Sequence, residues 1–348
     1  MPWVGLVGLA AALGLSLASL HRHSEPEITA SRAGMVWIPG GEFTMGSTNS
    51  LARANERPAH RVRVRGFWMD RTPVTNAQFA AFVAATGFRT TAERRPTWAT
   101  LKSQLPPGTA RAAESSLVPG AMVFVGTAAP VEFNDYTRWW RYVSGAYWRH
   151  PQGPASSIDG KADHPVVQVS YDDALSFAKW VGKRLPTEAE WEFAARGRLH
   201  NATYAWGNEF APRGQKMANI WDGASHAFPV VSKESRPPGT SRVCTYPTNA
   251  FDLCDVTGNV WQWVSDWYRD DAYTQASTVN ITVDPQGPVV SHDTEEPNVP
   301  VNAPKRVIRG GSFLCGAEYC LSYRPSARRG NDPLSGMSHL GFRLVYPP

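Results

Sequence analysis

The chain has 348 residues, of which 29 are Gly, 28 are Pro and 14 are Trp, and only 19% are charged. Gly and Pro exceed their share of roughly 12% in average proteins, which argues against coiled coils and helical bundles, while 42% hydrophobic residues exclude disorder over most of the chain. The formal net charge of +5 comes from scattered basic residues without helix-turn-helix or zinc-finger spacing, which argues against nucleic-acid binding.

An apolar stretch from Trp3 to Leu20 opens the chain and is followed by His21-Arg22-His23. We expect residues 1–23 to be a signal peptide or an uncleaved N-terminal membrane anchor, because such a stretch is at the lower limit for crossing a bilayer. Residues 24–33 are expected to form a linker, and the folded domain to span residues 34–346. The leader predicts an extracytoplasmic location, either the ER lumen of the secretory pathway or the periplasm.

Two segments after the linker have the patterns of strands. The segment from Met35 to Gly46 predicts two short strands joined by a Gly turn. From His60 to Asp70, Val62, Val64 and Phe67 alternate with arginines, which indicates a half-exposed strand.

Three helices are predicted from capping boxes, in which a Ser or Thr and a residue three positions later satisfy free N–H groups. The boxes begin at Thr75, Ser170 and Thr187, and apolar side chains follow each one at helical spacing. Gly197 is the predicted end of the third helix. The stretches 91–165 and 270–304 are expected to be mostly loop. The fold class predicted from these elements is an irregular α/β domain.

The four cysteines are Cys244, Cys254, Cys315 and Cys320. In an exported chain, their spacing favours two disulfides, Cys244 with Cys254 and Cys315 with Cys320. Alternatively, the second pair would hold a soft two-coordinate ion such as Cu(I), which thiolate ligands select. A zinc site is disfavoured, because neither pair has Cys-x2-Cys spacing or a neighbouring pair of histidines.

Two further segments are open to two interpretations each. The segment from Asp255 to Trp263 combines a carboxylate, a Gly turn and two tryptophans, so it is either a calcium-binding loop or a turn over buried aromatics. The two glycines between Arg309 and Ser312 form either an anion-binding nest or a tight turn. The residues by themselves do not name a reaction.

Five segments carry a resemblance to a known family. They are MVWIPGGEFTMGS from Met35, His164 to Phe210 with its GKRLPTEAEWE run, ANIWDG from Ala218, TGNVWQW from Thr257, and RGGSFLCGAEYC with the following SHLGFRLV. On these motifs the chain resembles the formylglycine-generating enzyme family, also called sulfatase-modifying factors. The resemblance implies a fold related to C-type lectins with low regular secondary structure. The general motifs specify the fold, and the cysteine pair within GGSFLCGAEYC marks the oxidase branch.

The resemblance implies a copper-dependent oxidase that uses O2 to convert a sulfatase cysteine, within a Cys-x-Pro-x-Arg segment, to Cα-formylglycine. By this resemblance, Cys315 and Cys320 would bind Cu(I), and Ser312 and Trp261 would line the pocket for oxygen and thiol. We therefore expect a reactive thiol pair there and one disulfide, Cys244–Cys254. The implied partners are a sulfatase polypeptide, unfolded or extended at its cysteine, and a thiol reductant.

The resemblance also assigns peptide contacts and calcium ligands. Trp148 and Tyr319 would line the peptide groove. The residues that match family calcium ligands are Asn219 and Ile220 for one ion, and Asp255, Gly258, Val260 and Gln262 for a second. The acidic ligand of the first site would fall near Ser235, where the usual pattern is missing, so that site is expected to be lost. Because Gln262 replaces the usual Glu, weaker calcium binding is expected at the second site, with partial compensation by Asp255.

The alternative function is a non-catalytic binding module of the same fold that associates with sulfatases or glycans. The cysteine pair discriminates between the two, because a module that only binds needs neither thiol.

Overall fold

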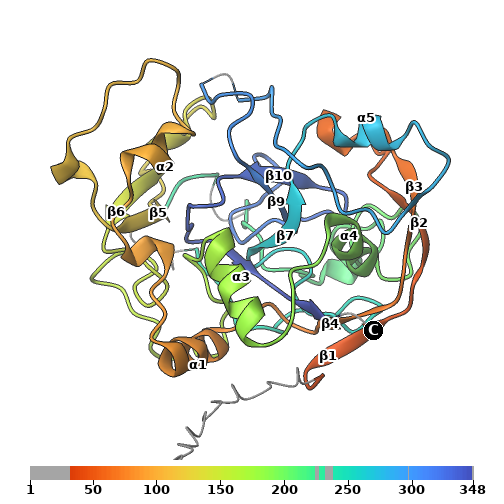
Figure 1. Ribbon diagram of the computed structural model, residues 1–348. Coiled ribbons are helices and arrows are strands. Elements are labelled where there is room, and N and C mark those ends of the chain that lie inside the picture. Colours follow the sequence, from red (N-terminus) through yellow and green to blue (C-terminus); the bar gives the residue numbers. More distant parts are fainter. Residues whose placement is uncertain (1–31, 224–226, 232–237, 297, 347–348) are drawn as a thin grey trace, which may run out of the picture.

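The computed structural model describes residues 32–223, 227–231, 238–296 and 298–346. The predicted leader, most of the predicted linker and Ser235 lie outside these ranges. The described residues form four small β-sheets and a few short helices, which confirms the predicted irregular α/β fold (Figure 1). In this part of the chain, no helix combines the length and the apolar character that crossing a membrane requires.

The strands are short, and long connections separate most of them. Those of the described residues are β1 (Met35–Ile38), β2 (Gly41–Met45), β3 (His60–Val64), β4 (Phe67–Asp70), β5 (Gly120–Phe124), β6 (Trp140–Ser144), β7 (Trp261–Trp267), β8 (Thr282–Val283), β9 (Arg306–Arg309), β10 (Arg328–Asn331), β11 (Leu340–Phe342) and β12 (Val345–Tyr346). The central sheet has the order β10-β9-β7-β11, and three smaller sheets have the orders β1-β4-β12, β2-β3-β8 and β5-β6. Because β12 pairs with β4, the C-terminal segment joins a sheet built near the start of the domain.

The helices lie around these sheets. Those of the described residues are α1 (Asn76–Thr86), α2 (Trp98–Lys102), α3 (Tyr171–Trp180), α4 (Glu188–Arg196) and α5 (Ala272–Ala276), with 3-10 turns at Ala54–Glu56, Thr91–Glu93, Glu114–Ser116, Tyr136–Arg138 and Pro212–Gly214. The predicted capping boxes are confirmed, because the side chains of Thr75, Ser170 and Thr187 each accept a bond from the N–H three residues later. Gly197 ends α4 with a φ of 64°, as predicted.

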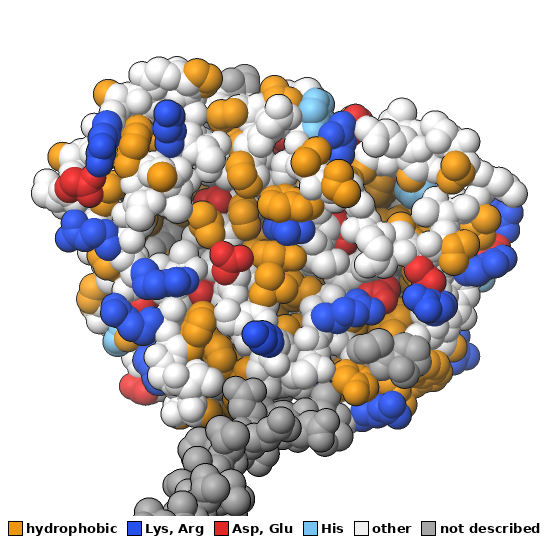
Figure 2. All heavy atoms as spheres, viewed as in Figure 1, with side chains coloured by type: hydrophobic (Ala, Val, Ile, Leu, Met, Phe, Trp, Pro, Cys, Tyr) orange, Lys and Arg blue, Asp and Glu red, His pale blue; other side chains and the backbone are white. Residues whose placement is uncertain are grey.

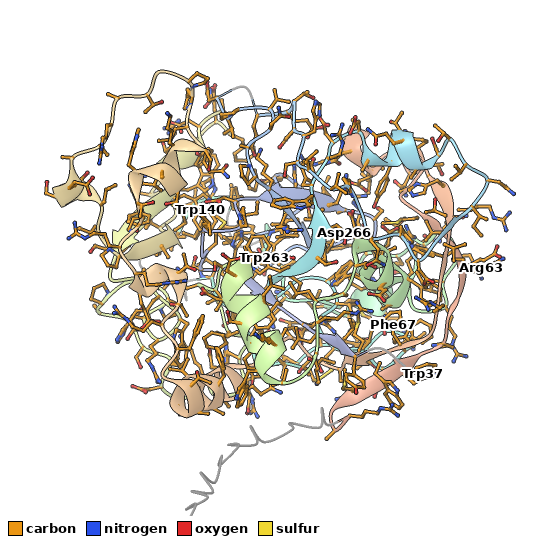
Figure 3. The ribbon with its side chains drawn as sticks, viewed as in Figure 1. Trp37, Arg63, Phe67, Trp140, Trp263 and Asp266 are labelled. Carbon is orange, nitrogen blue, oxygen red and sulfur yellow. A yellow bond between two sulfur atoms is a disulfide. The ribbon has the colours of Figure 1, made fainter. Side chains whose placement is uncertain are left out.

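The segment from His60 to Asp70 forms two strands, β3 and β4, in different sheets, and not the single strand that was predicted. The predicted alternation of buried and exposed residues is confirmed in β3. Val62 and Val64 are buried, whereas Arg61 and Arg63 are exposed and both pair with Glu42 of β2. Figure 3 shows Arg63 at the outer edge of the molecule. One face of the small sheet therefore packs on the core, and the other face is exposed to solvent.

The region between residues 91 and 165 contains more regular structure than predicted. It includes α2, and β5 and β6 pair along their whole length as an antiparallel hairpin. In β6, Trp140 is buried, but the four residues that follow are exposed or half-buried. Without regular alternation, a strand lacks the signal by which it is recognised in a sequence.

Tryptophan side chains fill the core beside the central sheet. Trp263 of β7 is fully buried, and its Nε1 donates to the Val169 carbonyl oxygen at 3.1 Å. Its ring meets the Tyr171 ring edge-on, with 5.9 Å between centroids. Figure 3 shows Trp263 and Asp266 near the centre of the molecule. Large buried rings thus supply core volume that long helices supply in other folds.

Two carboxylates of α4 hold a buried cluster of arginines. Glu188 accepts from Arg309 Nη1 at 2.9 Å and from Arg328 Nε at 2.6 Å. Glu192 accepts from Arg309 Nη2 at 2.5 Å and from Arg196 Nη2 at 2.6 Å. All five residues are buried. Arg309 ends β9, Arg328 begins β10, and the two are register partners, so α4 is tied to both ends of the segment 310–327 between these strands.

The surface carries charges of both signs. On the face drawn in Figure 2, Lys and Arg side chains are spread out and separated by acidic and hydrophobic ones. Among the described residues on this face, the basic side chains do not gather in one patch, in agreement with their scatter along the sequence.

Removing the shared carboxylate of the arginine cluster should destabilise the fold strongly. We expect Glu188→Gln to lower the free energy of unfolding by about 3–5 kcal/mol, because the buried Arg328 loses its carboxylate partner and the buried Arg309 loses one of two. Urea unfolding measures this change. The matched control is Glu114→Gln, which removes an exposed ion pair with Arg111 and should have little effect, because solvent screens such pairs. Equal effects of the two substitutions would contradict the assigned role of Glu188.

Asp266 predicts a pH dependence of stability. Burial, reinforced by the Glu188 carboxylate, raises the pKa of Asp266 to about 7, whereas the pKa of an Asp in the unfolded chain is about 3.9. Between these values the folded state binds the extra proton, so the contribution of Asp266 to stability is present at low pH and is lost as the pH rises through 7. Asp266→Asn should therefore raise the urea midpoint relative to wild type, and the increase should be larger at pH 8 than at pH 4.5. A shift of the same size at both pH values would refute this linkage.

Candidate active site

The two cysteines Cys315 and Cys320 lie in the connection between β9 and β10, residues 310–327, here named the cysteine loop. Gly310 and Gly311 begin it with φ of 92° and 67°. A Cβ at these positions would lie 2.7 Å from the Val256 carbonyl oxygen and 2.8 Å from that of Ser322, respectively. The two glycines therefore form a tight turn against neighbouring backbone, which only glycine accommodates.

Backbone hydrogen bonds bring the two cysteines together. The Cys315 N–H donates to the Ser312 carbonyl oxygen at 2.9 Å, and the Cys320 N–H donates to that of Gly316 at 3.3 Å. The Trp221 N–H donates to the Cys315 carbonyl oxygen at 3.1 Å. The Cα atoms of Cys315 and Cys320 are 4.6 Å apart, and both residues are buried.

The structure joins Cys315 to Cys320 in a disulfide. The expectation of a free thiol pair is therefore wrong for this state of the chain, and the pairing indicated by cysteine spacing alone is the one observed. The physical reason is the tight loop, whose Cα separation falls within the range that a disulfide spans. Two sulfurs held this close are joined by oxidation and separated by reduction.

Ser312 contacts Cys315 through its backbone, and Trp261 belongs to the same buried cluster as the two cysteines. Ser312 is fully buried, and its Oγ accepts from the Leu314 N–H at 3.2 Å. Among the described residues, its hydroxyl proton has no acceptor, so it remains available as a donor. Trp261 is buried in the hydrophobic cluster that also contains both cysteines. Its backbone N–H donates to the His339 carbonyl oxygen at 2.9 Å.

Trp148 does not lie on a groove. It is 1% exposed and packs edge-on against Phe79 of α1, with 5.2 Å between ring centroids. Tyr147 and His150 exchange backbone hydrogen bonds of 3.2 and 2.9 Å, and the turn that they close directs Trp148 into the core. The predicted peptide contact through Trp148 is therefore not favoured.

Tyr319 forms an aromatic wall at the cysteine loop. Its half-buried ring stacks on Phe228, with 4.1 Å between centroids and 9° between planes. Phe133 and Trp139 meet the same ring edge-on. Burial raises the pKa of the Tyr319 hydroxyl, so this side chain stays a neutral phenol at physiological pH.

A cavity of about 420 Å³ opens over the cysteine loop. Gly316, Ala317 and Glu318, which lie between the two cysteines, form part of its lining. Most of the remaining lining is apolar, including Trp206, Phe210, Met217, Ile220, Trp221 and Phe228. A larger cleft of about 1260 Å³ shares Lys216, Ile220, Trp221 and Asp222 with it. The two spaces together provide an extended depression that reaches Gly316, Ala317 and Glu318, between the two buried cysteines.

The two predicted calcium segments lie against each other. The Asn219 carbonyl oxygen accepts from the Asn259 N–H at 2.7 Å, and a Cβ at Gly258 would lie 2.7 Å from the same oxygen. Asn219 Nδ2 donates to the Gly239 carbonyl oxygen at 3.0 Å, and Ile220 lines both cavities. The predicted acidic position of this first site, Ser235, lies outside the described residues.

In the second predicted site, protein groups already occupy the candidate ligands. Asp255 Oδ2 accepts from the Cys244 N–H at 2.8 Å, and Gln262 is fully buried and bonded through both side-chain atoms. Val260, between Gly258 and β7, is fully buried. These residues do not fit a calcium ion in this arrangement.

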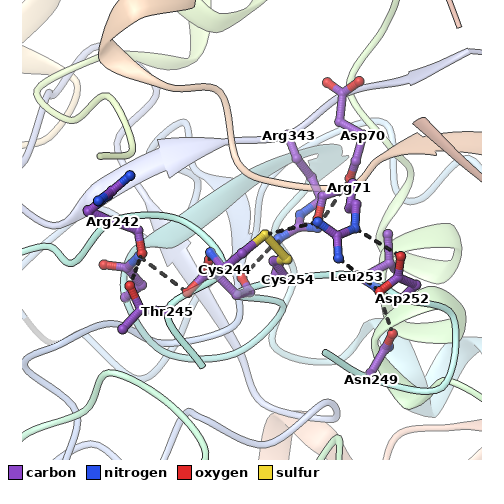
Figure 4. Close-up of a disulfide and its surroundings, with 12 residues drawn as sticks. Asp70, Arg71, Arg242, Cys244, Thr245, Asn249, Asp252, Leu253, Cys254 and Arg343 are labelled. Carbon is purple, nitrogen blue, oxygen red and sulfur yellow. Dashed lines mark hydrogen bonds and ion pairs between the residues drawn. A yellow bond between two sulfur atoms is a disulfide. The ribbon is translucent and has the colours of Figure 1, made fainter. Parts of the chain in front are cut away.

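The predicted Cys244–Cys254 disulfide is confirmed (Figure 4). Arg71 lies over it, donating from Nη1 to Cys244 Sγ at 3.4 Å and pairing with Asp252 at 2.9 Å. Arg343 Nη2 donates to the Cys254 carbonyl oxygen at 2.7 Å. The disulfide therefore closes a loop that two arginines hold against the body of the domain.

His339 is a buried polar residue near the site that sequence reasoning left unassigned. Its ring contacts Trp140, with 4.8 Å between centroids, and its Nδ1 has no hydrogen-bond partner among the described residues. Burial lowers the pKa of His339 to about 3, so the imidazole is neutral. Its position in the SHLGFR motif, directly before strand β11, which pairs with β7, is the sequence feature that could have indicated it.

The family model of the sulfatase-modifying factor enzyme 1-like domain (FGE-sulfatase) matches residues 21–347. The chain belongs to the sulfatase-modifying factor family. The formylglycine-generating enzyme of Mycobacterium tuberculosis is 45% identical over 316 residues, which cover 90% of this chain and 98% of the relative. The formylglycine-generating enzyme of Mus musculus is 42% identical, with 89% of this chain and 74% of the relative covered.

Family membership includes proteins without activity. The inactive Cα-formylglycine-generating enzyme 2 of Bos taurus is 35% identical over 89% of this chain and 87% of the relative. Among solved structures, PvdO from Pseudomonas aeruginosa is similar with a TM-score of 0.53 and 23% identity, covering 90% of this chain and 94% of that one. This likeness shows that the two chains share a fold.

The Cys244–Cys254 disulfide should stabilise the fold. Replacing both cysteines by serine should lower the free energy of unfolding by about 2–4 kcal/mol, because the unfolded chain gains freedom when its cross-link is lost. Non-reducing urea unfolding measures the loss. Wild type and the double serine variant should both retain the Cys315–Cys320 disulfide, which peptide mapping checks. An unchanged urea midpoint would contradict this role.

Proposed function

We propose that this chain is a formylglycine-generating enzyme, an oxidase that converts a sulfatase cysteine in a Cys-x-Pro-x-Arg segment to Cα-formylglycine with O2. The observation that carries the proposal is the pair Cys315 and Cys320, held side by side under an apolar cavity whose lining includes the residues between them. The high identity to named formylglycine-generating enzymes over most of the chain supports it.

The donor set at this loop fits Cu(I). Two cysteine sulfurs with Cα atoms 4.6 Å apart become, after reduction, the pair of soft thiolates that Cu(I) prefers. A Cu(I) ion bound there would supply redox chemistry toward O2 and an open position for the substrate thiolate. Because the pair is a disulfide in the structure, the proposal requires a thiol reductant before the first turnover.

The same thiol reductant supplies the remaining electrons that the overall reaction needs. The thiol-bearing carbon of the substrate cysteine becomes an aldehyde and loses two electrons, and sulfur leaves as hydrogen sulfide when the thioaldehyde is hydrolysed. Two thiols of the reductant give the other two electrons and form a disulfide. One O2 accepts all four electrons, and the net products are the aldehyde, hydrogen sulfide, a disulfide and one water.

The residues around the cysteines have separate tasks in this proposal. Trp261, which belongs to the same buried cluster as both cysteines, helps to exclude water from the site, which strengthens polar interactions at the reacting atoms. The Ser312 hydroxyl donates its free proton to a sulfur or oxygen atom there. Phe228, which lines the cavity and is held by the stacked ring of Tyr319, forms a rigid wall that orients the entering peptide.

The substrate in this proposal is a sulfatase polypeptide that is extended at its cysteine. The cavity of about 420 Å³ above the cysteine loop has the size of a site for a small segment, and the adjoining cleft receives flanking residues. A folded substrate would not bring a buried cysteine to the loop, which supports modification before the sulfatase folds.

We place the enzyme in an oxidising compartment, the ER lumen or the periplasm. The Cys244–Cys254 disulfide supports this location, because structural disulfides form and persist in such compartments.

A non-catalytic binding module is the second candidate. The observation that favours it is the inactive bovine relative, which is similar over most of the chain. In that case the Cys315–Cys320 disulfide would be structural, and the cavity would only bind a sulfatase segment.

The two candidates differ in an oxidation assay. Reduced, Cu(I)-loaded protein is incubated in air with a thiol and a peptide containing Cys-Thr-Pro-Ser-Arg, and mass spectrometry follows conversion of the cysteine to the aldehyde. We expect conversion by wild type and a fall to buffer background for Cys315→Ser and Cys320→Ser, because each removes one thiolate. The matched control, Cys244→Ser with Cys254→Ser, removes two thiols away from the cavity and should retain activity. Absence of conversion by wild type favours the binding module.

Copper binding is tested separately from activity. Under anaerobic conditions, the reduced protein is titrated with Cu(I) against a chromogenic chelator. One tightly bound Cu(I) is expected for wild type and for the Cys244→Ser, Cys254→Ser control, and none of comparable affinity for Cys315→Ser. Equal affinity in all three proteins would reject copper binding at the cysteine loop.

A further inference from the structure

The side-chain amide of Gln262 has only one chemically possible orientation. Its Oε1 accepts from Trp191 Nε1 at 3.0 Å and from Arg343 Nε at 2.6 Å. An indole N–H and a guanidinium N–H are donors only, so the atom that faces them must be the oxygen. The Nε2 group therefore faces the other way and donates to the Asp255 carbonyl oxygen at 2.9 Å.

This orientation replaces a calcium ligand by a donor. Calcium takes six to eight oxygen ligands, and the family resemblance implies a carboxylate at position 262. In this chain an N–H group points toward the loop instead, where a Glu would present its second oxygen. A divalent cation at that place would be repelled by the N–H dipole and would lack an acidic ligand.

A buried guanidinium satisfies the same loop from the other side. Arg343 is fully buried, and its Nη2 donates to the carbonyl oxygens of Cys254 at 2.7 Å and Asp255 at 2.8 Å. Nη1 lies 3.3 and 3.4 Å from the carbonyl oxygens of Asp70 and Arg71. Arg343 therefore fixes the backbone at Cys254 and Asp255 against the segment of Asp70 and Arg71.

The Asp255 carboxylate is engaged as well. Oδ2 accepts from the Cys244 N–H at 2.8 Å, and Oδ1 lies 3.4 Å from Asn259 Nδ2. The disulfide of Cys244 with Cys254 fixes the donor of the first bond directly beside Asp255. A covalent cross-link and a hydrogen bond therefore hold the part of the loop that a metal ion would otherwise hold.

We propose that Gln262 excludes calcium from the second predicted site in this chain, and that the Cys244–Cys254 disulfide holds the part of the loop that the ion would otherwise hold. The loop from Asp255 to Gln262 is then independent of calcium. The proposal concerns this loop alone and does not depend on the catalytic function.

The single substitution Gln262→Glu should restore the calcium site. In Gln262→Glu, one carboxylate oxygen still accepts from Trp191 and Arg343, while the other faces the Asp255 carbonyl oxygen in place of an N–H. Two oxygens at this separation repel each other unless a cation lies between them. The variant should therefore be less stable than wild type without calcium and should acquire a calcium site.

The experiment compares wild type, Asp255→Asn and Gln262→Glu as full-length oxidised proteins freed of metal with chelator. Calcium stoichiometry is measured by calorimetric titration, and Tm is measured in chelator and in CaCl2. Wild type and Asp255→Asn should bind the same number of ions, whatever the segment at Asn219 contributes. Gln262→Glu should bind one ion more and regain in CaCl2 the Tm that it loses in chelator. Gln152→Glu, at an exposed position, is the matched control and should gain no ion.

Two outcomes would overturn the proposal. If Asp255→Asn binds one ion fewer than wild type, the wild-type loop holds calcium after all. If Gln262→Glu gains no ion, Gln262 does not exclude the metal. Should Gln262→Glu fail to fold even in CaCl2, that too counts against a regained site, and the comparison of wild type with Asp255→Asn still decides whether the native loop is free of calcium.

Discussion

The position of the cysteine loop depends on the buried ion pairs between α4 and the strands on either side of it. Arg309 immediately precedes the loop, Arg328 immediately follows it, and both guanidinium groups bind Glu188. Within the loop, Arg324 binds Glu56 at 2.6 Å, which ties its later half to the N-terminal part of the domain. Desolvating these charges is costly unless every partner is present, so the network accepts one geometry of the loop.

The chemistry at the loop follows from this rigidity. Because both ends are held, the turn at Gly310 and Gly311 and the short bonds after Ser312 define where the sulfurs lie. Cys315 and Cys320 are brought together without a metal ion, as their disulfide demonstrates. In the proposed function, the fixed loop lowers the conformational cost of bringing two thiolates to one soft ion after reduction.

Buried guanidinium groups have the same structural use in a second place. At the loop from Asp255 to Gln262, Arg343 binds carbonyl oxygens from two segments and also the Gln262 amide oxygen. Arginine suits this task because its planar, permanently charged group presents several donors in fixed directions. Unlike a metal ion, it cannot be removed by dilution or chelation, and the nearby disulfide adds a covalent constraint.

The sequence by itself determined the elements whose signals are local. The capping boxes at Thr75, Ser170 and Thr187 specify helix starts within four residues, and the alternation around Val62 specifies a half-buried strand, because these patterns need no distant partner. Five motifs distributed along the chain were sufficient to place it in its family. Cysteine spacing also indicated both disulfides, although the resemblance favoured a free pair at Cys315 and Cys320.

Only the tertiary structure decided the features that join distant residues. The β5–β6 hairpin lacks an alternating pattern, and the turn around Trp148 directs that ring into the core and away from a groove. Gln262 is oriented by donors 71 and 81 residues away in the chain, so its sequence position alone indicated a weakened calcium ligand and could not reveal a donor facing the loop. The reason is physical: a side-chain amide orients toward whichever groups the fold brings next to it, and those groups are known only when the chain is folded.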